Sequence, residues 1–132
     1  MNKTLTVAFP GDKRVSVEMD GMTVHTDQPV KEGGLGETPT PFGLFLASLA
    51  TCAAHYARSF CDTRKLSTKG LGLAMHLGFD EKVKRYTTVR FELTLPEDFP
   101  DKYRAPIMRA VEACYVKKHL ENPPAFTTEI KG

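Results

Sequence analysis

The sequence has little of what marks several common classes of protein. Its formal net charge is only +2, so it carries no charge excess that favours a nucleic acid or a membrane surface as partner. It has three cysteines, an odd number that makes no framework of structural disulfides and indicates reduced thiols in the cytoplasm. The N-terminus holds no apolar run long enough for a signal peptide. A length of 132 residues predicts a single domain, residues 1–132, with its own core.

The chain is organised around residues 38–65, which read as one long helix. Thr40 is a suitable N-cap, and Pro41 suits the first helical position, where its missing N–H is not needed. No charged residue occurs from Phe42 to Tyr56. Serine, threonine and histidine interrupt this stretch, and it is too short for a bilayer, so it predicts a core helix rather than a membrane span.

Alternating apolar residues on either side of this helix predict antiparallel strands. The expected elements are a three-stranded meander over 3–26, an exposed and mobile loop over 27–39, a hairpin over 71–79 and 87–95, a helix over 101–121 and a last strand over 126–130. The order β-β-β-α-β-β-α-β is that of an α+β domain. One sheet layer cannot cover both faces of so apolar a central helix, so we expect a partner subunit to complete the core.

The three cysteines fall on the two predicted helices. Cys52 and Cys61 are nine residues apart, which places them about half a turn apart around the helix and about 13.5 Å apart along it. A disulfide needs Cα atoms within about 7 Å, so these two cannot bond within this helix. Cys114 lies on the second helix. The simplest interpretation is that Cys52 and Cys114 are small buried hydrophobic residues, as free cysteines commonly are.

Two chemical roles are alternatives to this interpretation. A zinc site would combine Cys52 and His55 with Cys114 and His119, but the second pair diverges by about 140° on a helix. A nucleophilic role needs a thiolate. Cys52 lies about 16 Å from the start of its helix, where the dipole has no effect, so a cation from elsewhere in the fold is expected to lower its pKa. Arg14, beside a turn, is the candidate for that cation, unless it is a solvated turn residue.

The stretches PTPFGLFLASLATCAAHYAR and VEACYVKKHL resemble the OsmC/Ohr family, named for osmotically inducible protein C and the organic hydroperoxide resistance protein. The resemblance spans essentially the whole chain. It implies antiparallel sheets around a long central helix and an intertwined homodimer with active sites at the subunit interface.

The resemblance also implies the chemistry. Cys52 would attack the O–O bond of an organic hydroperoxide and become a sulfenic acid, and Cys114 would resolve it as a disulfide. A dithiol such as a lipoylated protein would reduce that disulfide, with no cofactor or metal required. Arg14 is the nearest match to the family's arginine. An apolar pocket around Cys52, for which Phe42, Phe45 and Tyr56 are candidate lining residues, would favour alkyl or fatty-acid hydroperoxides.

The sequence departs from the family pattern at one position. Members that are hydroperoxidases carry a glutamate ten residues before the first cysteine, and this chain has Phe42 there and Gly43 next. Glu37 in the preceding loop is a possible substitute at a different spacing. The pattern thus leaves two functions open: a two-cysteine peroxidase, or an OsmC-fold protein that binds a small apolar ligand or senses redox state with little turnover.

Overall fold

A computed structural model describes residues 2–132 of the chain. The chain divides into two compact units, one up to Ala47 and one from Ser48 onward, so the boundary falls inside the long helix. The single domain over 1–132 stays a prediction. No helix among the described residues is long and apolar enough to cross a membrane.

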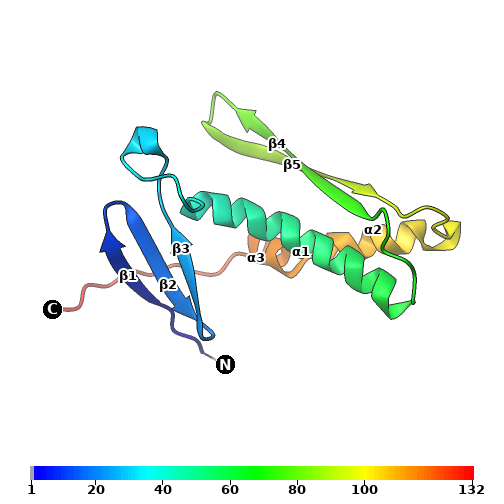
Figure 1. Cartoon of the computed structure of the whole chain (residues 1–132), viewed down its shortest axis with the longest axis horizontal. Coiled ribbons are helices and arrows are strands. Elements are labelled where there is room, and N and C mark those ends of the chain that lie inside the picture. Colours follow the sequence, from blue (N-terminus) through cyan, green and yellow to red (C-terminus); the bar gives the residue numbers. More distant parts are fainter. Residues whose placement is uncertain (1) are drawn as a thin grey trace. The chain divides into compact units, whose positions relative to one another are not determined.

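The first unit contains the predicted meander, with strands β1 (Thr6–Gly11), β2 (Arg14–Met19) and β3 (Met22–Thr26) in sheet order β1-β2-β3 (Figure 1). Both pairings are antiparallel. The second turn is tight because Asp20 and Gly21 both adopt positive φ, 51° and 77°, which suits a two-residue hairpin. β1 is an edge strand, and its Phe9 is 80% exposed.

The loop that follows β3 is folded around Asp27, where the sequence predicted an exposed, mobile segment. Asp27 is 1% exposed, and its carboxylate accepts hydrogen bonds from the N–H groups of Gln28 at 2.8 Å and Leu35 at 3.1 Å. The loop includes one 3-10 turn, η1 (Val30–Glu32). A Cβ on Gly34 would lie 2.0 Å from the carbonyl oxygen of Gln28, so only glycine allows this close approach.

The long helix α1 (Pro41–Thr63) begins as predicted. The Thr40 hydroxyl accepts a hydrogen bond from the N–H of Gly43 at 2.9 Å, which is an N-cap contact. The helix ends in a Schellman motif: Lys65 adopts φ 56°, and the N–H of Leu66 donates to the carbonyl of Cys61 at 2.9 Å.

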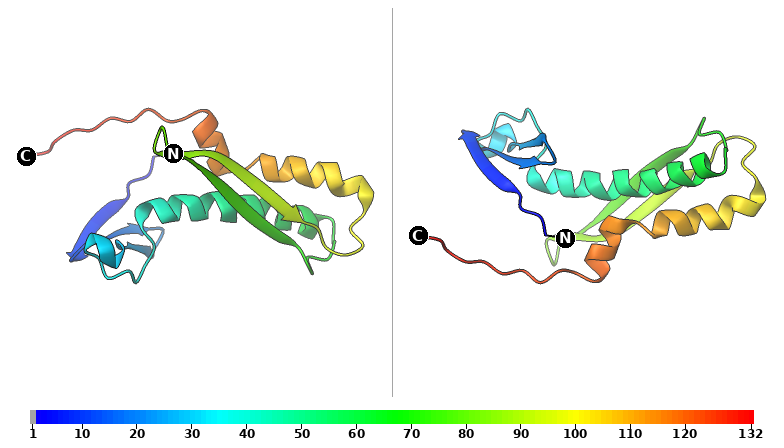
Figure 2. Two further views of the ribbon diagram at one scale, coloured as in Figure 1. Left: turned by 90° about the horizontal axis from the view of Figure 1, so that it is seen from above. Right: turned by 90° about the horizontal axis from the view of Figure 1, so that it is seen from below.

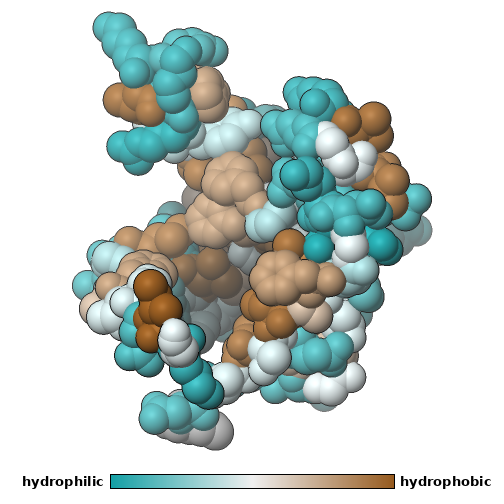
Figure 3. All heavy atoms as spheres, turned by 90° about the vertical axis from the view of Figure 1, so that its left-hand side faces the viewer, coloured by the Kyte–Doolittle hydropathy of each residue, from teal (hydrophilic) through white to brown (hydrophobic). Residues whose placement is uncertain are grey.

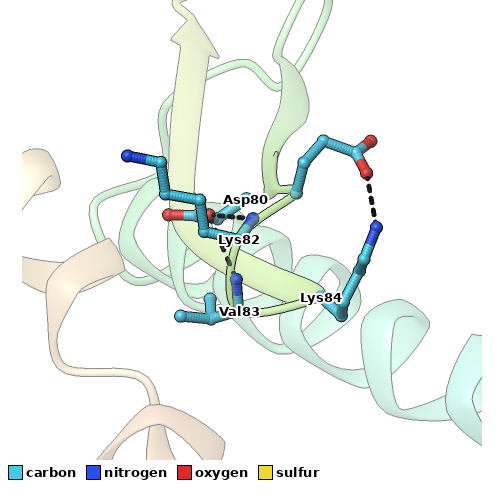
Figure 4. A network of polar contacts seen from close by, with 5 residues as sticks. Asp80, Lys82, Val83 and Lys84 are labelled. Carbon is cyan, nitrogen blue, oxygen red and sulfur yellow. Dashed lines mark hydrogen bonds and ion pairs between the residues drawn. The ribbon is translucent and has the colours of Figure 1, made fainter.

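The second unit packs a hairpin against the rest of α1. Strands β4 (Gly72–Asp80) and β5 (Arg85–Thr94) pair antiparallel, close to the predicted 71–79 and 87–95. Their turn is held by Asp80, whose Oδ1 accepts the N–H groups of Lys82 and Val83, while Lys84 pairs with the Glu81 carboxylate at 3.2 Å (Figure 4). The hairpin crosses α1, with α2 alongside (Figure 2).

The predicted helix over 101–121 is wrong as a single element. The structure has a 3-10 turn, η2 (Asp101–Tyr103), then α2 (Arg104–Glu112) and α3 (Tyr115–Glu121), with a break at Ala113 and Cys114. The apolar stripe that predicted the helix ends at Cys114, because the positions one turn on are Lys117 and Lys118. No packing stripe therefore holds α3 in line with α2.

The predicted strand over 126–130 is also wrong for the described chain, in which residues 123–132 form no strand. A strand requires a neighbour for its N–H and C=O groups, and the segment runs on as an extended tail after α3 (Figure 2). Phe126 and Ile130 are 89% and 94% exposed. Apolar side chains are visible at the surface in Figure 3. The α+β class with two antiparallel sheets is confirmed.

The core of the second unit lies between α1, α2 and the hairpin. Its buried members are Ala53, Ala57, Phe60, Cys61, Ile107 and Val111, with Leu71, Leu73, Phe91 and Leu93 packed against them. The alanines let the neighbouring elements approach α1 closely. Cys61 is fully buried in this core.

We expect Ile107→Ala to lower the free energy of unfolding by about 2–5 kcal/mol, because it opens a cavity at a fully buried position. Met108, the next residue, is 53% exposed, so Met108→Ala is the matched control and should change stability by less than about 0.5 kcal/mol. Urea denaturation followed by circular dichroism measures both. Equal losses in the two variants would contradict the assignment of this core.

Candidate functional site

Cys52 and Cys114 lie together in the second unit, although they are far apart in the sequence. α1 carries Cys52, and the break between α2 and α3 carries Cys114, whose φ of −50° and ψ of 127° are not helical. Their side chains are hydrogen-bonded to each other. Cys52 is half-buried, Cys114 is 2% exposed, and both thiols are free.

The break between the helices supplies hydrogen-bond donors to the Cys52 sulfur. The N–H groups in the first turn of a helix have no partner within it. Two of them at the start of α3, on Tyr115 and Val116, donate to the sulfur of Cys52. In a continuous helix over 101–121, the same N–H groups would donate to carbonyl groups four residues earlier in that helix. The hydrogen bonds to Cys52 therefore depend on the break between α2 and α3.

The surroundings of the pair separate the pKa values of its two thiols. Burial alone would raise the pKa of Cys52, but hydrogen bonds from the Cys114 side chain and from the N–H groups of Val116 and Tyr115 outweigh it and lower that pKa. Burial, together with donation of the S–H to Cys52, raises the pKa of Cys114. Of the two thiols, Cys52 is therefore the one that ionises more readily, and its thiolate is the nucleophilic form.

A cation from elsewhere in the fold was expected to lower the pKa of Cys52. Within the second unit, the groups that lower it are a thiol and two backbone amides. Arg14 belongs to the first unit, where it lies 3.6 Å from the Asp12 carboxylate. Its action on Cys52 stays a prediction.

The three aromatic residues that were expected to line a substrate pocket all lie on α1. Tyr56 is one turn after Cys52 on α1 and contacts the ring of His55 edge-on, with centroids 5.7 Å apart. Phe42 and Phe45 contact each other in the first turns of α1, with centroids 5.6 Å apart. Both belong to the first unit, and the role of these three rings in binding a substrate stays a prediction.

The residues of the alternative zinc site are not gathered. His119 contacts the Tyr115 ring and carbonyl on its own helix. Within residues 2–132, no three His, Cys, Asp or Glu side chains are close enough to hold a metal ion.

An apolar cavity of about 280 Å³ lies between β5 and α2–α3 in the second unit. Its walls are Val89, Phe91, Leu93, Met108 and Val111, with Arg90, Glu112 and Lys117 also lining it. Cys52 is not among the lining residues. The expected apolar pocket around Cys52 stays a prediction, and sequence reasoning did not identify this second cavity.

Comparisons with known proteins agree with this fold. Residues 34–129 match the family model described as OsmC-like protein. A search of curated proteins found no match. Among solved structures, a candidate osmotic stress induced and detoxification response protein from Psychrobacter arcticus 273-4 is similar, with 23% identity over 89% of this chain and 88% of that one and a TM-score of 0.70.

Two further structures are organic hydroperoxide resistance proteins. The protein from Legionella pneumophila is 21% identical over 89% of each chain, with a TM-score of 0.55. The protein from Elizabethkingia anophelis is 18% identical over 92% of this chain and 91% of that one, with a TM-score of 0.52. At these identities the likeness concerns the fold.

We expect Cys52 to be the thiol that iodoacetamide alkylates fastest at neutral pH, because its lowered pKa gives it a larger thiolate fraction than Cys61 or Cys114, whose pKa values are raised. Cys114→Ala removes the S–H donor and so raises the pKa of Cys52. The alkylation rate of Cys52 then increases only at higher pH, and at pH 7 it should be about tenfold lower than in the parent. Cys114→Ser keeps a donor and should lose less. Alkylation of each cysteine is followed by mass spectrometry between pH 5 and 10. A Cys52 profile unchanged in Cys114→Ala would show that the thiol contact does not set this pKa.

Proposed function

Since this chain belongs to the OsmC-like protein family, we propose that it is a two-cysteine thiol peroxidase that reduces organic hydroperoxides. The observation that carries the proposal is the hydrogen-bonded pair of Cys52 and Cys114, in which the pKa of Cys52 is lowered and that of Cys114 is raised. Most cysteines that serve only to pack a core lack such a partner, and their pKa is raised by burial, as it is at Cys61.

The proposed reaction has two steps. The Cys52 thiolate attacks the terminal oxygen of the hydroperoxide, the O–O bond breaks, and the alkoxide takes a proton and leaves as an alcohol. Cys52 is then a sulfenic acid. The Cys114 sulfur attacks this group, and the hydroxyl and the Cys114 proton leave as water. Two thiols and one hydroperoxide thus give one disulfide, one alcohol and one water, and a dithiol such as a lipoylated protein restores both thiols.

The contacts of the pair suit this order of events. Burial is the largest cause that raises the pKa of Cys114, and the hydrogen bond to Cys52 and the charge of its thiolate raise it further. Oxidation of Cys52 would remove the charge and weaken the hydrogen bond, so the pKa of Cys114 would fall, while burial would still raise it. Cys114 would therefore ionise more readily after Cys52 has reacted than before.

The second candidate is a protein that binds a small apolar ligand or senses redox state without appreciable turnover. The absence of the family glutamate at Phe42 favours it, as does the 280 Å³ apolar cavity, which is separate from the cysteine pair. Catalytic turnover of hydroperoxide distinguishes it from the first candidate.

We expect one equivalent of cumene hydroperoxide to convert the reduced protein to a Cys52–Cys114 disulfide, detectable by peptide mapping. Cys52→Ser should abolish this product and lower peroxide consumption with a dithiol by at least about a hundredfold, because it removes the nucleophile. Cys61→Ala is the matched control. Cys61 is buried in the core, so its variant should form the disulfide at the parental rate. Oxidation at Cys52 no faster than at Cys61, without turnover, would support the binding protein instead.

We also propose that the protein is a homodimer located in the cytoplasm. The dimer is supported by family membership and by large apolar side chains left exposed in the single chain, including Phe9, Phe126 and Ile130. Exposed apolar side chains of this size commonly mark a contact surface when they gather into a patch.

Size-exclusion chromatography with light scattering should give a mass about twice the 14.7 kDa of the chain, because a second copy would cover these side chains. The measurement is made at two protein concentrations tenfold apart. A mass of one chain at both concentrations would contradict the dimer and leave the chemistry of the cysteine pair to be judged by the peroxide assay.

A further inference from the structure

The first unit contains a cavity of about 210 Å³ bounded by β2, β3 and the loop folded around Asp27. Its polar and apolar walls come from Pro10, Arg14, Val15, Ser16, His25, Thr26, Asp27, Glu37 and Thr38. It therefore brings Arg14 and two acidic residues, Asp27 and Glu37, around one small space. The Thr38 hydroxyl, also lining this space, is buried without a hydrogen-bond partner among the described residues.

Asp27 is the buried charge of this cavity. Its carboxylate accepts hydrogen bonds from the backbone N–H groups of Gln28, Leu35 and Glu37. Its own N–H donates to the carbonyl of Pro39 at 3.1 Å. A carboxylate has about four acceptor sites, so these bonds leave capacity for a further donor and do not cancel the negative charge. Asp27 thus fixes the loop and presents its charge to the cavity.

Two carboxylates attract Arg14. The ion pair with Asp12, at 3.6 Å, is between side chains that are 44% and 59% exposed, and such pairs are held weakly. Asp27 is not at ion-pair distance, and it acts on Arg14 from across the cavity. The hydrogen bond from Gln28 lowers the pKa of Asp27 most, burial raises that pKa, and attraction to Arg14 adds the smallest lowering effect. Solvent screens a buried charge much less than an exposed one, so the attraction from Asp27 is screened less than that from Asp12.

We propose that Asp27 is a positioning residue for Arg14: it closes the 27–39 loop beside the guanidinium and holds that group by charge across the cavity. In this chain it would take over the part of the glutamate that Phe42 replaces at the start of α1. The consequence for catalysis rests on the proposed function together with the sequence-based prediction that Arg14 acts on Cys52. The electrostatic attraction between Arg14 and Asp27 does not depend on the proposed function.

A double-mutant cycle tests the catalytic consequence. The rate constant for oxidation of Cys52 by cumene hydroperoxide is measured for the parent, Arg14→Gln, Asp27→Asn and the double variant. We expect Asp27→Asn to slow oxidation about five- to tenfold in the parent and less than twofold in the Arg14→Gln background, since the two act as one unit. Equal slowing in both backgrounds would mean that Asp27 only stabilises the loop, and would overturn the proposal.

Two matched variants separate Asp27 from the other carboxylates near Arg14. Glu37 lines the cavity but is exposed, and Asp12 is the exposed ion-pair partner, so Glu37→Gln and Asp12→Asn should each change the rate by less than about twofold. A larger effect of either variant than of Asp27→Asn would assign the positioning role to that residue and overturn the proposal.

A second measurement needs no enzymatic activity and no Asp27 variant. The Asp27 carboxyl is titrated by carbon-13 NMR in the parent and in Arg14→Gln, with Asp12, His25 and Glu37 followed as the other titrating groups near Arg14. The proposal expects a higher pKa of Asp27 in Arg14→Gln, because a charge that Asp27 attracts also stabilises its ionised form. An unchanged pKa overturns the proposal, even where Asp27→Asn fails to fold.

The two measurements also separate the proposal from the proposed function. If Arg14→Gln leaves the oxidation rate unchanged but raises the pKa of Asp27, the positioning contact stands and the role of Arg14 in catalysis fails. If Arg14→Gln slows oxidation and the pKa of Asp27 does not move, Arg14 is catalytic and Asp27 does not position it.

Discussion

The chemistry proposed for this protein depends on the hydrogen bonds that converge on the sulfur of Cys52. A half-buried thiolate is unfavourable unless donors replace the water that it loses. Here one donor is the S–H of Cys114, and two others are backbone N–H groups, on Tyr115 and Val116. All three come from one short stretch of chain, so a single backbone feature, the break between α2 and α3, determines whether the thiolate is stable.

That break is supported from the side of α2. α2 is anchored by Ile107 and Val111, which pack with Ala53 and Ala57 of α1 in the core of the second unit. The same helix α1 therefore presents Cys52 and, through its alanines, holds the element that leads to Cys114. α3 has no buried residue, so it is not tied to the core and is oriented by the chain that precedes it. The small residues around Cys52 are thus part of the site even though they have no polar group.

The sequence predicted correctly the helices and strands that are specified by a pattern within a short stretch of residues. Strict alternation gave the meander and the hairpin, and the Thr40 cap with the uncharged stretch after it gave α1, because these patterns report packing on a single face. The break at Cys114 was missed although the apolar stripe stops there, since helix propensity continues through Tyr115 and beyond. The buried carboxylate of Asp27 was missed for another reason: its partners are backbone N–H groups, which no side-chain pattern records.

The sequence also brought Cys52 and Cys114 together only through a family resemblance, because 62 residues separate them and no local rule joins such positions. It could not show which thiol ionises more readily. That order follows from the S–H of Cys114, which donates to Cys52, and it has a consequence for the proposed reaction. These hydrogen bonds are strong while Cys52 is charged and would be weak once it is bonded to Cys114. They would then stabilise the dithiol relative to the disulfide, so in the proposed cycle the disulfide would be the more strongly oxidising partner for a reducing dithiol. If the chain has the proposed activity, the same contacts that activate Cys52 thus also favour reduction of the disulfide.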